Sequence, residues 1–414
     1  MSEQQTSRQG YPFKSEGHSA RPFYSPPQKL MAWVILGIGG ALLAASYVYS
    51  GWQYVILFLL GFLIGFTLFH TNYGFSTVYK QLFEDGNTEM LRGHMQKLLI
   101  ATTLFALILG TQTAFFEESP DGAIAPVSTG LVVGAFLFGF GMNIGSNLAP
   151  QAMKTIKGGR TALLFTASGF LTGSTIGVAH FTFWNDTMPN AAAVSIAEDT
   201  PLGFTGAWLL QSTVFAAVII GTYVHQKRKL PPPLPKMPRG VNRTELLFRS
   251  WPIWVGATAV ALLNAAVLMV QGSPWKVTSA FSLWGSKIAY HLGLNPADWD
   301  YWGDQADVNE LTNSVFTSSM SVLNFGIIIG ALLTMALAGL FRLRKIPFHL
   351  AGITLIGGTL MGYGAAISSG ANIGAYFSGL ASMSLHAWIW TMMAVSGVYT
   401  AYFISRKLPF LASK

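Results

Sequence analysis

The chain has 414 residues, of which 51% are hydrophobic and only 10% are charged, and its mean hydropathy is +0.44. Because soluble domains carry about 25% charged residues, this composition excludes a disordered chain, a fibrous protein and a soluble enzyme. The sequence has no cysteine, so disulfides, thiolate metal sites and thiol chemistry are excluded as well. The composition indicates a polytopic membrane protein.

Ten apolar segments, none of which contains Lys, Arg, Asp or Glu, approach the length of about 20 helical residues that crosses a bilayer. The first follows a polar stretch without a signal peptide, so we expect it to be an uncleaved anchor. The sequence therefore predicts an all-α polytopic membrane protein with about ten transmembrane helices plus short re-entrant helices. The predicted spans are 31–49, 53–70, 98–114, 127–145, 161–181, 206–224, 252–271, 320–341, 350–367 and 386–404.

The basic residues alternate with these spans. With the N-terminus inside, the inner segments hold 23 of the 25 lysines and arginines, and the outer segments hold only Lys276 and Lys287. Eleven of the 17 acidic residues fall outside. Since basic loops stay on the cytoplasmic side, the pattern predicts a multi-pass protein of a bacterial inner membrane with both termini cytoplasmic.

A basic, proline-rich linker over 225–251 divides the spans into two halves, and its prolines cannot continue a helix. We therefore expect a cytoplasmic tail over 1–30, a first transmembrane half over 31–224 and a second over 252–414. We interpret the linker as a solvated loop that orients the helices, in preference to a specific binding site for a partner.

The two halves resemble each other at an offset of 223 residues. Gly139-Phe140-Gly141 aligns with Gly362-Tyr363-Gly364 at this offset. A weaker match upstream relates Ser76-Thr77-Val78-Tyr79 to Thr278-Ser279-Ala280-Phe281, with about 20 extra residues between the two motifs in the second half. The charge pattern gives the matched spans opposite directions across the membrane. Together these features predict an inverted repeat, an architecture common among secondary transporters.

Each repeat continues into a small, uncharged segment, 142–151 in the first half and 368–379 in the second. Such segments are typical of broken or re-entrant helices, which place backbone N–H groups and a positive helix end within the bilayer. A matched pair that converged from opposite faces would bind an anion without a charged side chain. The alternative is that these glycines only allow close helix packing.

These motifs resemble the YeeE/YedE family of sulfur-compound transporters. The resemblance covers about 50–405 and is most specific over 361–388, which includes Asn372-Ile373-Gly374-Ala375-Tyr376-Phe377-Ser378-Gly379. It implies thiosulfate uptake through an inverted repeat whose short helices converge on the path. The family's cysteines fall at Leu148 and Ala371, and a third falls near Gly74, so relay of the substrate between thiols is impossible here.

We expect a small anion to be held by backbone, hydroxyl and amide donors, since no charged side chain lies in the predicted spans. No catalytic residue, metal site, cofactor or nucleic acid is expected; the expected partners are the anion and the lipid bilayer. A soluble sulfur-handling partner or a homo-oligomer stays open. The predicted pathway residues are Ser76, Thr77, Asn143, Ser146, Asn147, Leu148, Thr278, Ser279, Ser369, Gly370, Ala371, Asn372 and Ser378.

Three hypotheses of function remain at this point. The first is a permease for thiosulfate or another small sulfur-containing anion. The second is a permease or channel for a different small solute, in which the thiol positions were lost because the substrate changed. The third is a non-transporting membrane subunit on the same scaffold. The polar segment from Asn372 to Ser378 favours transport, whereas the loss of the cysteine motif around Leu148 favours the third.

Overall fold

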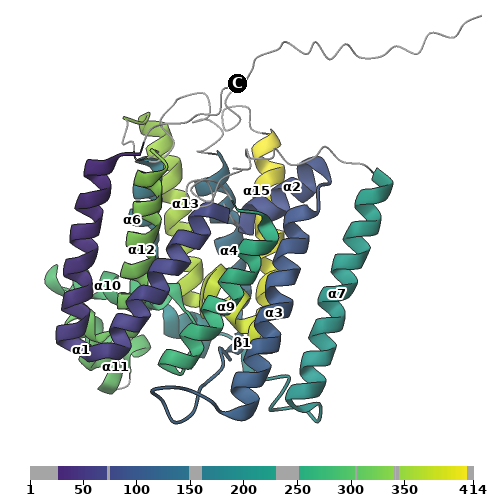
Figure 1. The fold of residues 1–414 in the computed structure, drawn as a ribbon, viewed down its shortest axis with the longest axis horizontal. Helices are drawn as coiled ribbons and strands as arrows, with labels where there is room; N and C mark the ends of the chain where they lie inside the picture. Colours follow the sequence, from purple (N-terminus) through teal and green to yellow (C-terminus); the bar gives the residue numbers. More distant parts are fainter. Residues whose placement is uncertain are drawn as a thin grey trace, which may run out of the picture.

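A computed structural model describes residues 27–71, 75–148, 161–229, 251–303, 305–339, 341 and 345–407. Its longest helix, α1 (Lys29–Thr71), has 43 residues, or about 65 Å of helix, which is twice the thickness of a hydrocarbon core. The helix is interrupted at Gly51, whose φ of 77° lies in the left-handed region. Figure 1 shows the two arms of α1 as a V, so α1 supplies two crossings.

The other crossings match the remaining predicted spans, and the all-α polytopic fold is confirmed. Among the residues that the structure describes, eight helices including α1 are long and apolar enough to cross a membrane. A shorter helix, α4, continues directly into the π-helical segment η1. These elements are α3 (Glu89–Thr111), α4 (Thr129–Met142), η1 (Asn143–Leu148), α6 (Thr161–Ala179), α7 (Gly203–Lys229), α9 (Ile253–Gln271), α12 (Ser319–Leu337), α13 (Phe348–Ile367) and α15 (Leu385–Lys407).

Shorter elements lie between and beside these helices. Two strands, β1 (Pro126–Ser128) and β2 (Asn190–Ala193), form a small antiparallel ribbon. The acidic residues after α10 fold into short helices beside it. The remaining elements are α2 (Phe75–Asp85), η2 (Phe183–Thr187), α10 (Val277–His291), η3 (Pro296–Asp298), η4 (Asp300–Trp302), α11 (Gln305–Thr312), η5 (Val315–Thr317), η6 (Asn372–Ser378) and α14 (Gly379–Ala381).

The two ends of the bundle differ in charge. We call the end that holds Lys29, Lys227 and Lys407 the basic end, and it is uppermost in Figure 1. The opposite end, which we call the acidic end, holds β1 and α11 and the acidic segments that contain Glu117 and Asp300. The described helix ends therefore follow the separation of charge that the sequence predicts.

Glycines let the helices of the two halves meet at their backbones. The second arm of α1 packs along α12, and a Cβ atom on Gly61 or Gly65 would collide with a carbonyl oxygen of α12. Gly326 and Gly330 on α12 lie in the same way against carbonyl oxygens of Phe58 and Phe62. Small residues at helix interfaces in membranes allow such close approach.

Helix contacts repeat between the halves as the internal repeat predicts. α6 packs on α13, and α15 packs on α4, while α4 and α13 pack on each other. The contacts of Gly130 with Ile367 and of Gly141 with Gly357 make α4 and α13 antiparallel. The matched glycine-to-carbonyl contacts are Gly173 with Thr359 and Gly362 with Phe170 in one pair of helices, and Gly397 with Phe136 and Gly139 with Ala394 in the other. An offset of 223 relates each contact to its counterpart to within one residue.

The glycine interface predicts a position-specific loss of stability. Gly65→Ala places a methyl group against the carbonyl oxygen of Ile327, and overpacking of this kind costs about 1–3 kcal/mol. We expect a melting temperature several degrees lower for the purified protein in detergent. Gly40→Ala on the same helix is the control, because nothing lies within 4 Å of its added Cβ atom. Equal melting temperatures for the two variants would contradict the packing.

Candidate functional site

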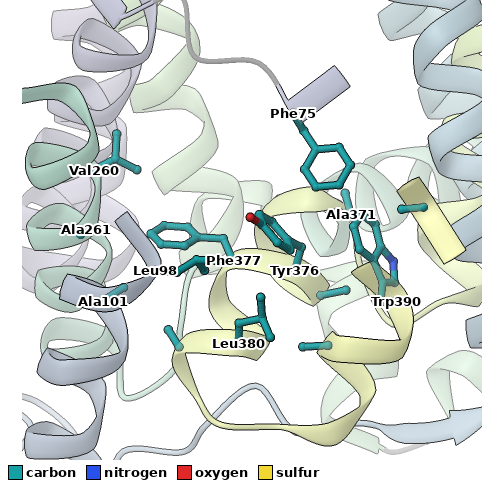
Figure 2. Close-up of a cluster of buried hydrophobic side chains, with 14 of the residues drawn as sticks. Phe75, Leu98, Ala101, Val260, Ala261, Ala371, Tyr376, Phe377, Leu380 and Trp390 are labelled. Atoms are coloured by element: carbon teal, nitrogen blue, oxygen red, sulfur yellow. The ribbon is translucent and has the colours of Figure 1, made fainter. Parts of the chain in front are cut away.

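The helical conformation is interrupted after α13, at the position where the sequence predicts the start of a re-entrant segment. Ser369 and Gly370 adopt positive φ values of 57° and 138°, and Ala371 is extended. The following short helix, η6 with α14, is buried in the main hydrophobic core (Figure 2). Tyr376 and Phe377 are both 1% exposed. η6 is therefore a re-entrant helix rather than a crossing one.

A second segment returns into the bundle between α9 and α10. Gly272, with a φ of 69°, ends α9, and the chain then folds back so that the Trp275 N–H donates to Asn264 Oδ1 at 3.3 Å. Asn264 lies seven residues before the end of α9, so the loop turns back toward the interior of the bundle. The indole of Trp275 is 1% exposed. α10, at 15 residues, is too short to cross a bilayer from this starting point.

Ser378 joins the two re-entrant segments. Its hydroxyl donates to the Trp275 carbonyl oxygen at 3.0 Å and accepts from Asn264 Nδ2 at 3.3 Å. Both polar side chains are 0% exposed. Because backbone polar groups at membrane depth need partners within the protein, this pair of hydrogen bonds holds η6 against the returning loop.

A cavity of about 90 Å³ lies where η6, α2, α3 and the returning loop meet. A buried water needs about 10–15 Å³, so the cavity has room for several waters or one small anion. Among its described lining residues, one carries a formal charge, Lys97, and none is a carboxylate. The lining residues are Leu68, Phe75, His94, Lys97, Val260, Trp275, Asn372, Ile373, Tyr376 and Phe377.

Lys97 is the residue that the sequence analysis missed. We predicted a span from residue 98 and a pathway without charged side chains, whereas α3 begins at Glu89 and brings Lys97 into the lining of the cavity. Lys97 is only 6% exposed, and its ammonium lies 4.1 Å from the ring centroid of Phe377 and 5.5 Å from that of Tyr376. Such cation–π contacts favour a buried ammonium. An ionisable residue at membrane depth is costly and is typical of a functional site.

His94 lies one helical turn from Lys97 and faces the same core. Its Nδ1 is 3.5 Å from the Tyr376 hydroxyl, and the ring is 3% exposed. From α2, Phe75 packs edge-on against Tyr376, with centroids 5.0 Å apart, and Figure 2 shows Phe75 above the end of η6. The spacing of Met90, His94, Lys97 and Ala101, all buried, is the helical signal that could have revealed the longer α3.

Of the predicted pathway residues, Asn372 lines the cavity. Ser369 and Gly370 form the turn before η6, and Ala371 packs in the hydrophobic core. Thr278 is buried, and its hydroxyl has no hydrogen-bond partner among the described residues.

Three further predicted residues have structural hydrogen bonds. Ser279 donates to the Lys276 carbonyl oxygen at 2.8 Å in the first turn of α10. Asn143 Nδ2 donates to the Val398 carbonyl oxygen at 2.8 Å and so fixes η1 to α15. Ser378 holds the re-entrant segments together, as described above.

The remaining five predicted residues are placed only by their backbones. Ser76 and Thr77 lie in the first turn of α2, next to the cavity residue Phe75. Ser146, Asn147 and Leu148 belong to η1, at the end of α4. Their side chains lie outside the described residues, so their predicted roles stay predictions.

Sequence comparison relates the chain to proteins of sulfur transport. Residues 70–400 match the family described as sulphur transport. The chain belongs to this family. Over 359 residues it is 24% identical to the thiosulfate transporter TsuA of Spirochaeta thermophila, with 84% of this chain and 97% of that protein aligned. The predicted resemblance is thereby confirmed.

A shorter alignment relates the chain to the probable transporter YedE of Escherichia coli K12. It shows 26% identity over 152 residues, which are 36% of this chain and 37% of that protein. A similar match exists in Salmonella typhimurium, at 26% over 155 residues and 38% of that protein. The aligned part thus spans less than two fifths of either YedE protein. The chain is a multi-pass member of a family of transporters, and the protein aligned almost end to end is named for thiosulfate.

The bridging role of Ser378 predicts a loss of stability. Ser378→Ala removes the donor to the Trp275 carbonyl oxygen, and an unsatisfied buried polar group costs about 1–3 kcal/mol. We expect a lower melting temperature in detergent. Ser396→Ala is the control, since this exposed hydroxyl bonds only within its own helix, to the Met392 carbonyl oxygen. A melting temperature for Ser378→Ala equal to that of the control would show that the bridge does not matter.

Proposed function

We propose that this protein is a permease for a small sulfur-containing anion such as thiosulfate, which binds in the cavity beside Lys97. The observation that carries the proposal is a buried ammonium, that of Lys97, in the lining of a cavity that the re-entrant helix η6 also lines. Membership of the sulphur transport family supports the substrate class.

The cavity offers an anion positive charge and N–H donors, which would replace the interactions with water that the anion loses. A monovalent anion about 4 Å from an ammonium gains about 4 kcal/mol at the effective dielectric of a partly buried site, and a second charge on the anion increases the attraction. Asn372 and Trp275, which line the same cavity, carry amide and indole N–H groups. In this proposal Lys97 and these donors replace the thiols that the sequence lacks.

The anion would pass between the two repeats. η6 follows the break after α13, and η1 continues the antiparallel helix α4 without a break, so in this proposal the route is lined by segments that follow matched helices of opposite direction. Secondary transporters with inverted repeats move one repeat against the other around a fixed site. The pathway residues on η1 and α2 complete the route in this proposal.

The absence of cysteine favours a second candidate, a permease for a different small anion. Competition distinguishes the two. Excess unlabelled thiosulfate should suppress uptake of radiolabelled thiosulfate more strongly than equal concentrations of sulfate, sulfite or phosphate. If wild-type protein takes up phosphate, which contains no sulfur, in preference to all three sulfur-containing anions, the second candidate is correct. If it takes up none of these anions, a non-transporting subunit remains.

We also propose that the basic end faces the cytoplasm of a bacterial cell and the acidic end faces outward, because basic segments stay inside. The cysteine-free sequence makes the test direct. A membrane-impermeant maleimide should label Glu118→Cys in intact cells, and it should label Lys227→Cys only after the cells are permeabilised. The reverse pattern would contradict the orientation.

The proposed site predicts that substitution of Lys97 lowers transport without lowering the stability of the protein. Lys97→Gln should reduce thiosulfate uptake at least tenfold, because the anion loses its positive partner. The melting temperature should hold or rise, since a buried charge destabilises unless it is well paired. Asn372→Leu, at another residue that lines the cavity, should also lower uptake. Lys227→Gln, an exposed lysine on α7, is the control. Normal uptake by Lys97→Gln, or uptake lost only together with folding, would contradict the proposed site.

A further inference from the structure

A histidine shares the cavity with Lys97. His94 and Lys97 lie three positions apart on α3, so they project from the same face of the helix, and both line the cavity. His94 is 3% exposed and Lys97 is 6% exposed. In the described lining of the cavity, these are the two side chains that can carry a positive charge near neutral pH. The cavity can therefore hold one positive charge or two.

Aromatic side chains hold the imidazole of His94 in place. Its Nδ1 is 3.5 Å from the hydroxyl of Tyr376, and the ring of Phe75 lies edge-on to it, with centroids 6.4 Å apart. A tyrosine hydroxyl can donate to a neutral imidazole nitrogen or accept from a protonated one. The contact with Tyr376 is therefore compatible with both protonation states of His94.

The titratable groups on the segments around His94 are few. Of the elements that pack on α3, α9 and α14 carry no titratable side chain, and those of α7 lie in its last two turns, at the basic end. η6 brings Tyr376, and α2 brings Tyr79, whose ring packs on Phe75 with centroids 4.9 Å apart. In the returning loop, Lys276 follows the lining residue Trp275 and does not itself line the cavity. The charged side chains of α2, those of Lys80, Glu84 and Asp85, lie outside the described residues.

The charge of the substrate gives the histidine a purpose. Thiosulfate is a dianion, and an inside-negative membrane potential opposes its entry. The ammonium of Lys97 stays in the protein, so it balances charge in the cavity but does not reduce the charge that crosses the membrane. A proton that binds with the anion and leaves with it does both.

We infer that His94 binds a proton together with each anion, so that the permease carries protons inward with its substrate. The inference rests on the proposed function. Positive charges on His94 and Lys97 repel each other in the empty cavity, which favours a neutral imidazole, whereas a bound dianion attracts both charges. The cavity has room for several waters. A water that is continuous with the solution gives a proton to the free imidazole nitrogen when the anion binds, and the imidazolium returns the proton to water when the anion leaves.

Binding of thiosulfate should therefore take up protons. We expect the purified protein, in weakly buffered detergent solution, to take up about one proton per bound anion, because the imidazole has one site for an added proton. A pH-indicator dye measures this uptake. His94→Gln keeps a polar side chain that cannot be protonated, so it should bind thiosulfate without proton uptake. His94→Asn is a second variant of the same kind, and His180→Gln, at an exposed histidine after α6, is the control that should behave as the wild type.

The same coupling gives affinity and transport a defined pH dependence. The imidazolium favours the bound dianion, so the Kd of the wild type should rise with pH, by up to about tenfold per unit for one linked proton. The Kd of His94→Gln should depend less on pH. In proteoliposomes without a membrane potential, an external pH one unit below the internal pH should speed up thiosulfate uptake at least fivefold for the wild type and less than twofold for His94→Gln.

The outcomes separate this inference from the proposed function. A wild type that binds thiosulfate without proton uptake overturns the inference alone, and this measurement needs no variant. Proton uptake that persists in folded His94→Gln or His94→Asn also overturns it, because the proton would then bind to Lys97 or to another group. Absence of thiosulfate binding and uptake in the wild type overturns the proposed function, and the coupling with it.

Discussion

A small anion that leaves water for a hydrocarbon layer loses strong hydration, and the protein must replace it with positive charge or hydrogen-bond donors. The same constraint applies to the protein, because a lysine at membrane depth is itself costly to bury. Lys97 satisfies both sides of this constraint. Its ammonium contacts the faces of two aromatic rings, and it lines a cavity large enough for a small anion. In our account, the occupied cavity compensates for the cost of the buried charge.

The rest of the fold positions the segments around this cavity. A re-entrant helix exposes backbone groups that neither lipid nor a neighbouring turn can satisfy. Asn264 and Ser378 satisfy such groups at Trp275, and Asn324 Nδ2 donates to the Val277 carbonyl oxygen at the start of α10. These polar side chains are buried in helices that otherwise carry apolar residues. Their hydrogen bonds hold the loop and η6 in contact without filling the space beside Lys97.

Close backbone packing makes room for the short segments. Where glycine lets α1 meet α12, and α13 meet α6, the crossing helices approach closely at their backbones. The matched contacts in the two halves place η1 and η6 at the ends of antiparallel partners. Of these two segments, η6 follows a break in the helix, whereas η1 continues α4.

Much of the fold was predictable because its signals are local. Apolar runs marked the eight long apolar helices of the described residues, and the glycine-rich stretch after Ile367 marked the turn before η6. The role of Lys97 was not predictable from hydropathy, because Arg92, Gln96 and Lys97 lower the local average and move the expected start of α3 past them.

The structural roles of Ser378 and Asn143 were also missed. Their partners, Trp275 and Val398, lie more than one hundred residues away in sequence, so only the tertiary fold reveals them. Lys276 was assigned to an outer loop, and the return of that loop toward η6 became clear only from its contacts with Asn264 and Gly374.

The central claim is that substrate binds in the cavity that Lys97 and η6 both line. The most direct test is a structure of the wild-type protein in lipid nanodiscs with thiosulfate. We predict density for one anion in the cavity, within about 4 Å of the Lys97 ammonium and beside the Asn372 amide, and none there in Lys97→Gln under the same conditions. Density for the anion elsewhere in the bundle, with the Lys97 cavity empty, would contradict the account.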